Sequence, residues 1–300
     1  MCLASAAAFG AMGVFGKLAY GDGSTVGTLL ATRFAVAALV LWAILAGTGR
    51  LSRLRALTRR DVIIAVALGA VGYGAQAGCY FAALDRMDAS LLALVLYTFP
   101  VMVTVAAIVL KRDAPSVRTA VALLVACVGL ILVLAGAAAG ALDPAGTALA
   151  LGAAAVYTVY ILSSEGISAR MDALTLATLV CSGAAVTLTV AGVAGGDLDP
   201  GAVTGQGWLW LVSLAVVSTV GAIALFFAGL RRVGPTAAAI LSTLEPVVTV
   251  LLAGAVFGES LGPVQIAGGA LVLLAALVVR VPRDRVILNP TTEVSREQTA

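Results

Sequence analysis

The sequence predicts an all-α integral membrane protein with ten transmembrane helices, arranged as two inverted five-helix repeats. The prediction depends on composition, on the length of the apolar segments and on a similarity between the two halves. Of the 300 residues, 61% are hydrophobic and 11% are charged, and the mean hydropathy is +1.10. Soluble proteins carry about 25% charged residues, so this chain cannot cover a surface that faces water.

Ten apolar segments follow one another along the chain, separated by Gly, Pro, Asp and Arg. Each is continuous and about 20 residues long, as helices that cross the membrane require, whereas strands of a barrel would be shorter and alternating. The predicted helices cover 2–20, 26–47, 62–84, 89–110 and 117–137 in the first repeat, and 147–164, 173–194, 207–230, 235–257 and 263–280 in the second. The sixth is predicted to be the shortest. Residues 1–137 and 147–280 are the two repeats, and 281–300 form a polar cytoplasmic tail.

The distribution of basic residues predicts the orientation. With the N-terminus inside, the predicted cytoplasmic segments carry 15 of the 18 Lys and Arg residues. Lys17 and Arg86 lie on the outer side, and Arg33 lies within a helix. This asymmetry indicates a multi-pass protein of the cell inner membrane with both termini in the cytoplasm. The Arg-rich segment 50–60 is better explained by anionic lipid than by nucleic acid, so we expect the lipid bilayer as a partner and no nucleic acid.

The two halves show an internal repeat. A shift of 146 residues places the segment 80–86 on 226–232 and Pro100 on Pro246. Each half then has five helices with a proline that kinks the fourth, and an odd number of helices inverts the second copy in the membrane. Inverted repeats with interrupted helices at matching positions are typical of alternating-access carriers, whose binding site lies near the midplane.

Specific residues carry a resemblance to a known family. Leu244-Glu245-Pro246-Val247, followed by Gly258-Glu259, Gln265 and Gly268, is similar to the C-terminal repeat of the EamA-like family of the drug/metabolite transporter (DMT) superfamily. Arg33-Phe34 and the ten-helix layout match as well. The first repeat departs from the pattern, because Arg112-Asp113 replaces the Gly-Glu pair and Phe15 stands where a tryptophan is frequent. The resemblance covers about residues 5–280. It implies a carrier of small metabolites, for example an exporter of amino acids.

Two charged residues within helices are candidates for coupling or for a structural role. Glu245 is predicted near the middle of the ninth helix, beside Pro246. A charge at a helix centre costs roughly 2.5–3.5 kcal/mol, so Glu245 should face a cavity, pair with a cation or be protonated. It could bind protons or an amine, or it could cap the broken helix. Arg33 could hold a carboxylate or extend toward the membrane surface.

Candidate substrate-binding residues lie on shared helical faces. Spacings of three and four place Tyr73, Gln76 and Tyr80 on one face of the third helix. Tyr157 and Tyr160 share a face of the sixth helix, and Tyr97 precedes Pro100 in the fourth. Aromatic rings with polar edges suit amphipathic metabolites. The alternative for any one tyrosine is packing or anchoring at the membrane interface.

The sequence argues against enzymatic chemistry. It has no histidine, its four cysteines lack metal-ligand spacing, and it has no phosphate-binding loop. We therefore expect no metal, no cofactor and no catalytic residues. The favoured function is a secondary transporter of a small-molecule substrate, in which two five-helix halves rock about a central cavity. A channel, a structural membrane subunit and a membrane enzyme acting on lipids are the alternatives. The oligomeric state stays open, a monomer included.

Overall fold

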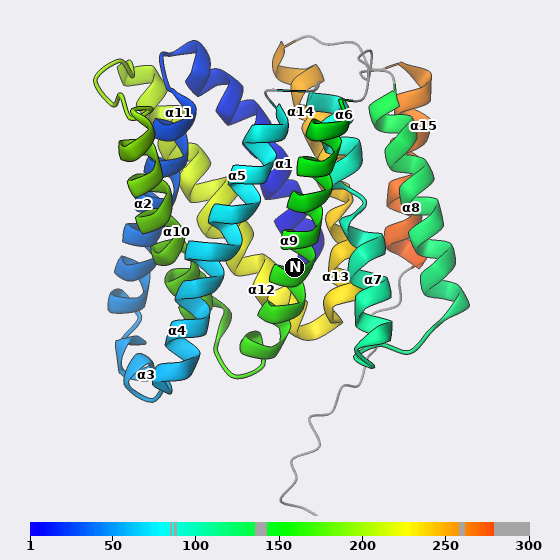
Figure 1. Ribbon diagram of the computed structural model, residues 1–300, viewed down its shortest axis with the longest axis horizontal. Coiled ribbons are helices and arrows are strands. Elements are labelled where there is room, and N and C mark those ends of the chain that lie inside the picture. The colour runs from blue at the N-terminus through cyan, green and yellow to red at the C-terminus, as the bar shows by residue number, and fades with distance from the viewer. Residues whose placement is uncertain (85, 87–88, 136–142, 258–261, 279–300) are drawn as a thin grey trace, which may run out of the picture.

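The protein is a single bundle of helices that run roughly side by side (Figure 1). The computed structural model describes residues 1–84, 86, 89–135, 143–257 and 262–278, and all regular secondary structure within them is helical. The first half contains α1 (Cys2–Gly21), α2 (Val26–Gly47), α3 (Leu51–Arg55), α4 (Arg59–Ala67), η1 (Leu68–Tyr73), α5 (Gly74–Leu84), α6 (Ala89–Leu96), α7 (Phe99–Val109) and α8 (Val117–Ala135). The second contains α9 (Pro144–Ser168), α10 (Ala173–Gly195), α11 (Gly205–Ala215), η2 (Val216–Gly221), α12 (Ala222–Val233), α13 (Pro235–Ser242), α14 (Leu244–Phe257) and α15 (Pro263–Val278).

Among the described residues, eight helical segments are long and apolar enough to cross a membrane. The shorter apolar helices α7 and α15 add to them. The prediction that the sixth segment is the shortest is wrong, because α9 has 25 residues. Asp143 starts it early by accepting a hydrogen bond from the Gly146 amide at 2.6 Å, and the first-turn Pro144 needs no partner for an N–H. The predicted tail, 281–300, lies outside the described residues.

Two kinds of irregularity recur in both halves. The fourth predicted helix is interrupted between α6 and α7, and the ninth is interrupted at Thr243, between α13 and α14. Pro100 lies in the first turn of α7 and Pro246 in the first turn of α14, where a missing N–H costs no helical hydrogen bond. In addition, η1 and η2 are wider π-helical turns within α4–α5 and α11–α12. Such turns are rare and often occur at functional sites.

The two halves of the chain interleave. The most extensive packing joins α2 to α10, α8 to α15, α1 to α14 and α5 to α9, each a contact between the halves. Figure 1 shows α8 with α15 at one edge of the bundle and α2 with α10 at the other. By contrast, α1 and α2, which are consecutive in sequence, barely touch. The halves are therefore not two separate bodies.

Glycines allow the closest of these contacts. A Cβ atom at Gly268 of α15 would lie 2.6 Å from the carbonyl oxygen of Gly129 in α8 and 2.7 Å from the Val133 amide nitrogen. These are backbone atoms, which cannot turn aside as a side chain can. Small residues at helix interfaces let backbones approach in this way when lipid offers no hydrophobic driving force.

Candidate functional site

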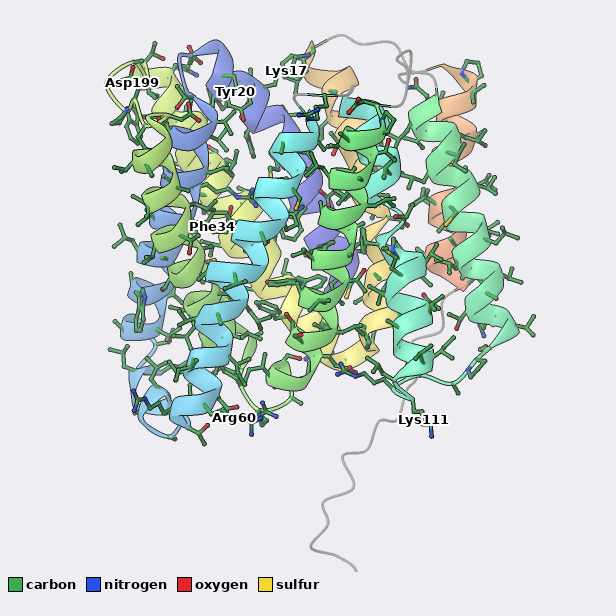
Figure 2. All side chains as sticks on the ribbon, viewed as in Figure 1. Lys17, Tyr20, Phe34, Arg60, Lys111 and Asp199 are labelled. Atoms are coloured by element: carbon green, nitrogen blue, oxygen red, sulfur yellow. The ribbon has the colours of Figure 1, made fainter. Side chains whose placement is uncertain are left out.

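A cavity of about 590 Å³ occupies the middle of the bundle. Residues of α1, α2, η1, α5, α6, α9 and α14 line it, so both halves contribute. Lys17 and Tyr20 line it and lie at the end of the bundle that carries Asp199, here named the Asp199 end (Figure 2). Arg60 and Lys111 lie at the opposite end, here named the basic end, and neither lines the cavity. The cavity therefore extends from the Asp199 end toward the middle of the bundle.

The structure brings the predicted site residues together around this cavity. All six candidates for substrate binding line it, as do both charged candidates and one of the two helix-breaking prolines. In chain order these are Arg33, Tyr73, Gln76, Tyr80, Tyr97, Tyr157, Tyr160, Glu245 and Pro246. Pro100 does not line the cavity, although its neighbour Phe99 does. Whether these side chains bind a substrate stays a prediction.

Aromatic rings from both halves form the deep end of the cavity. We name Phe34, Tyr73, Tyr160, Tyr157 and Phe99 the aromatic floor, because they form a continuous chain of ring contacts. Successive ring centroids are separated by 4.9, 5.4, 6.1 and 4.7 Å. Most of these pairs meet edge to face, the geometry that aromatic quadrupoles favour. Phe34 and Phe99 were not predicted as site residues, although Phe34 directly follows Arg33 and Phe99 directly precedes Pro100.

Arg33 is buried on α2 rather than extended toward the membrane surface. Its residue is 6% exposed. The Nε–H group donates to the Thr219 hydroxyl at 2.8 Å, and the guanidinium carbon lies 4.9 Å from the centre of the Phe34 ring. Thr219 belongs to the π-helical turn η2 and itself donates to the Leu214 carbonyl, five residues earlier. The wide turn thus presents the hydroxyl that fixes one edge of the guanidinium.

Glu245 lies near the middle of the span Pro235–Phe257, as predicted. The interruption at Thr243 also places it in the first turn of α14. A carboxylate is favoured at this position by the dipole at a helix N-terminus. The Tyr97 hydroxyl, from the break between α6 and α7, lies close enough for a side-chain hydrogen bond to this carboxyl group. Arg33 and Glu245 interact electrostatically across the cavity. They form no direct ion pair among those that the described residues make.

Ion pairs join the two halves at the basic end. Arg170 Nε lies 3.0 Å from an Asp61 carboxylate oxygen, and Arg112 lies 3.3 Å from Glu165. Arg50 lies 3.8 Å from Asp172. Each of these three described pairs links a residue before position 136 to one after position 143. All three pairs therefore hold the two halves together at the basic end.

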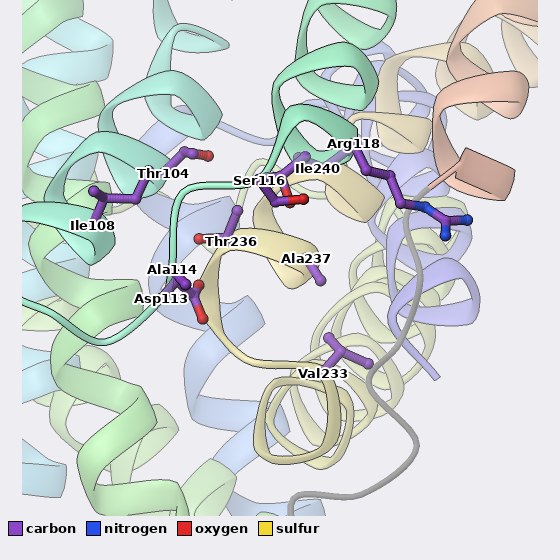
Figure 3. A pocket seen from close by; sticks show the side chains of 11 residues that line it. Thr104, Ile108, Asp113, Ala114, Ser116, Arg118, Val233, Thr236, Ala237 and Ile240 are labelled. Carbon is purple, nitrogen blue, oxygen red and sulfur yellow. The ribbon is translucent and has the colours of Figure 1, made fainter.

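A second, smaller pocket of about 290 Å³ lies at the basic end (Figure 3). It is formed by α7, the segment that follows Lys111, and α13. Asp113, Ser116, Arg118 and Thr236 line it together with apolar residues. The Thr236 hydroxyl is buried and has no hydrogen-bond partner in the part of the chain that the structure describes.

Membrane-length helices around an internal cavity define a multi-pass membrane protein. The chain belongs to the EamA-like transporter family, whose model matches residues 1–135 and again residues 144–281. It is therefore a membrane transporter, as the resemblance of the Glu245-Pro246 segment predicted. The Gly258-Glu259 pair of that resemblance lies outside the described residues.

Two known proteins are similar to this chain. An uncharacterized transporter of Archaeoglobus fulgidus is 38% identical over 71 residues, which cover 24% of this chain and 26% of that protein. The match thus spans about a quarter of the relative. A protein of known crystal structure aligns over 100% of this chain and 97% of its own, with a TM-score of 0.80 and 19% identity. At that identity the likeness establishes the fold alone.

Proposed function

We propose that this protein is a secondary transporter that exports small organic metabolites, such as amino acids, by alternating access. The observation that carries the proposal is the central cavity, which extends from the Asp199 end to the aromatic floor and meets ion-paired helices beyond it. A site that is accessible from one side and closed from the other is what an alternating-access carrier has in each of its end states. A conducting channel would need a continuous path at the same place.

The proposal includes ten transmembrane helices in two inverted five-helix repeats. In its support, the family model matches each half once. A shift of 146 residues also places the start of α2 within a residue of the start of α10, that of α4 on α11 and that of α8 on α15. The same shift places Tyr97, at the first helix break, on Thr243, at the second. Each half is then a structural repeat, and the interleaved packing means that it is not an independent domain.

The proposed location is the cell inner membrane, with both termini and the basic end in the cytoplasm. The excess of Lys and Arg at the basic end supports this orientation. The cavity then faces outward, and the ion pairs Arg112–Glu165 and Arg170–Asp61 lie on the closed cytoplasmic side. Inward opening requires these pairs to separate and the rings of the aromatic floor to part. The smaller pocket between α7 and α13 lies on that side, where a cytoplasmic vestibule would form.

The test is a transport assay with the purified protein in proteoliposomes, using a panel of radiolabelled amino acids, amines, carboxylates and sugars, with and without a pH gradient. We expect saturable transport of at least one small solute, and counterflow when the same unlabelled solute is inside. A flux that rises linearly with concentration would indicate a channel. Absence of transport for the whole panel would contradict the proposal.

A further inference from the structure

The smaller pocket at the basic end contains a buried hydroxyl group without a partner. Thr236, in the first turn of α13, is 5% exposed, and its hydroxyl makes no hydrogen bond within the described part of the chain. Such a group is costly, because it has lost its water without gaining another partner. Ser116 and Thr119 add two more hydroxyl groups to the lining. The pocket therefore offers hydrogen-bond donors to a polar ligand.

The start of α8 supplies further donors on one side of this pocket. The helix begins at Val117, and the amides of Val117, Arg118 and Thr119 make no hydrogen bond to a described residue. Amides at a helix N-terminus, together with the helix dipole, favour a negatively charged group. The Arg118 Nε–H group donates to the Val278 carbonyl at 2.5 Å, and no described residue accepts from its terminal nitrogens. This side of the pocket therefore suits the oxygens of a phosphate group.

The opposite side of the pocket carries a negative charge. Figure 3 shows Asp113 and Arg118 on opposite sides of the pocket. A lone phosphate would be attracted by Arg118 and repelled by Asp113. A ligand that carries an ammonium group next to its phosphate would match both charges. The charge distribution therefore favours a zwitterionic ligand over a simple anion.

The surroundings of the pocket are those of a lipid site. Ile108 and Ile240 give it an apolar wall. On the outside, Val109 of α7, Val117 of α8 and Leu277 of α15 are exposed, as apolar side chains that face lipid would be. The volume of about 290 Å³ is near the lower end of ligand-sized pockets, roughly 300–1,000 Å³. It can hold a headgroup but not the acyl chains, which would lie along the exposed apolar side chains.

We propose that this pocket binds the phosphoethanolamine headgroup of a membrane phospholipid. The phosphate lies against the first turn of α8 and Arg118, and the Thr236 hydroxyl donates to one of its oxygens. The ammonium group faces Asp113. Because α7 and α8 belong to the first half and α13 to the second, a bound lipid joins the two halves at the basic end. The site is separate from the central cavity, and the inference does not depend on the substrate.

The first test compares lipids on the wild-type protein. Delipidated full-length protein in detergent is titrated with dioleoyl phosphatidylethanolamine, phosphatidylcholine and phosphatidylglycerol, and native mass spectrometry gives the dissociation constants. Phosphatidylcholine cannot donate a hydrogen bond from its quaternary ammonium group, and phosphatidylglycerol has no cation. We expect phosphatidylethanolamine to bind about tenfold more tightly than either. Equal binding of the three lipids overturns the proposal. Equally tight binding of soluble glycerophosphoethanolamine contradicts a lipid as the source of the headgroup.

A variant of Asp113 then assigns the ammonium contact. Asp113→Asn should bind phosphatidylethanolamine and phosphatidylcholine with equal affinity, because the neutral amide no longer favours a cation that donates hydrogen bonds. Asp199→Asn makes the same change at an exposed residue outside the pocket and should keep the wild-type preference. An Asp113→Asn protein that keeps the full preference contradicts the assignment.

A variant of Thr236 tests the phosphate side. Thr236→Val keeps the shape of the side chain and removes the unpaired hydroxyl. The delipidated variant should unfold at a temperature no lower than the wild type, yet bind phosphatidylethanolamine about tenfold more weakly. Thr147→Val is the matched control, because it removes another buried hydroxyl without a described partner, on α9 and outside the pocket. It should bind the lipid as the wild type does. Unchanged lipid binding by Thr236→Val overturns the proposed site.

The lipid titration is independent of the transport assay. Loss of the lipid preference in Asp113→Asn identifies the headgroup site whether or not any solute is transported. Saturable transport by a protein that does not distinguish the three lipids overturns this inference and leaves the transporter function standing.

Discussion

At the scale of single residues, Glu245 is the acidic side chain that lines the cavity within the described part of the chain. Its carboxyl group interacts electrostatically with one cation and four tyrosines on the surrounding segments: Arg33, Tyr73, Tyr80, Tyr97 and Tyr157. A carboxylate that is reached from the cavity can exchange a proton for an ammonium group. That exchange would couple substrate movement to the proton gradient.

We expect Glu245→Gln to abolish transport driven by a pH gradient and to retain counterflow. Glutamine keeps the size and hydrogen bonding of the side chain but cannot exchange a proton. One charge that moves through 100 mV is worth roughly 2.3 kcal/mol, which sustains about a fiftyfold concentration ratio. Solute accumulation in proteoliposomes under an imposed pH gradient measures the loss.

Asp199→Asn is the matched control for this substitution. It makes the same acid-to-amide change at an exposed residue outside the cavity, and its oxygen can still accept the hydrogen bond from the Ala202 amide. If Glu245→Gln retains the full response to the gradient, then Glu245 is structural and coupling occurs elsewhere.

The polar face of η1 and α5 gives a second prediction at this scale. Tyr73→Ala and Gln76→Ala should each raise the KM for transport roughly tenfold, because each removes a cavity contact worth 1–2 kcal/mol. Val71→Ala changes a neighbouring side chain that is 67% exposed on the outer surface of the bundle, and should leave KM unchanged. Equal expression of the three variants excludes a folding defect. Unchanged kinetics in both cavity variants would remove this face from the binding site.

Much of the cavity lining could be predicted from residue type, because polar and aromatic side chains within apolar helices have few other places to lie. Thr219 could not be predicted, because threonine hydroxyl groups in membrane helices commonly donate to a carbonyl of their own helix. No neighbouring residue in the sequence distinguishes Thr219 from other threonines. Its importance arises from the π-helical turn and from Arg33, which lies 186 residues earlier. The internal repeat gave one indication of Thr219, because the shift of 146 residues places the predicted site residue Tyr73 on it.

At the scale of elements, close helix contacts set the tolerance to substitution. We expect Gly268→Ala to destabilise the protein by about 1–3 kcal/mol, because the added methyl group would meet backbone atoms of α8. Gly78→Ala is the matched control, since a Cβ there meets no atom within 4 Å. Thermal unfolding in detergent compares the two variants. Equal unfolding temperatures would show that α8 and α15 separate at little cost.

The helix ranges were predictable because about 20 consecutive apolar residues can hardly form anything else in a membrane. The π-helical turns and the exact helix ends were harder to predict. A π-helical turn such as η1 changes the hydrogen-bond pattern without changing composition, so hydropathy does not reveal it. The start of α9 was missed for a similar reason, because Asp143 and Pro144 were interpreted as loop residues although they cap the helix.

At the scale of the whole molecule, the orientation in the membrane can be tested directly. We expect cysteines placed at Ser52 and Thr299, in a cysteine-free background, to be protected from an impermeant maleimide in intact cells. Both positions lie on the predicted cytoplasmic side, which the arginine distribution sets. A cysteine at Gly201, in the connection between α10 and α11, should be labelled from outside. Labelling of a cysteine at position 52 or 299 from outside would contradict the predicted topology.

The sequence did not predict which helix packs against which. The repeat predicted two five-helix halves but not that α2 packs along α10 and α1 along α14. Contacts between apolar helices depend on surface shape at Gly, Ala and Thr, and many pairings are compatible with one hydropathy profile. The pairing is thus decided by three-dimensional fit.

This interleaving has a consequence for biogenesis. Helix α1 leaves the ribosome first, yet its main partner α14 is among the last to be made. Until η2 is inserted, Arg33 sits in a nascent intermediate without the hydroxyl that later fixes its Nε edge. The helices of the first half must therefore persist in the bilayer before their partners in the second half are made. The central cavity forms only late in synthesis, when α14 packs against α1.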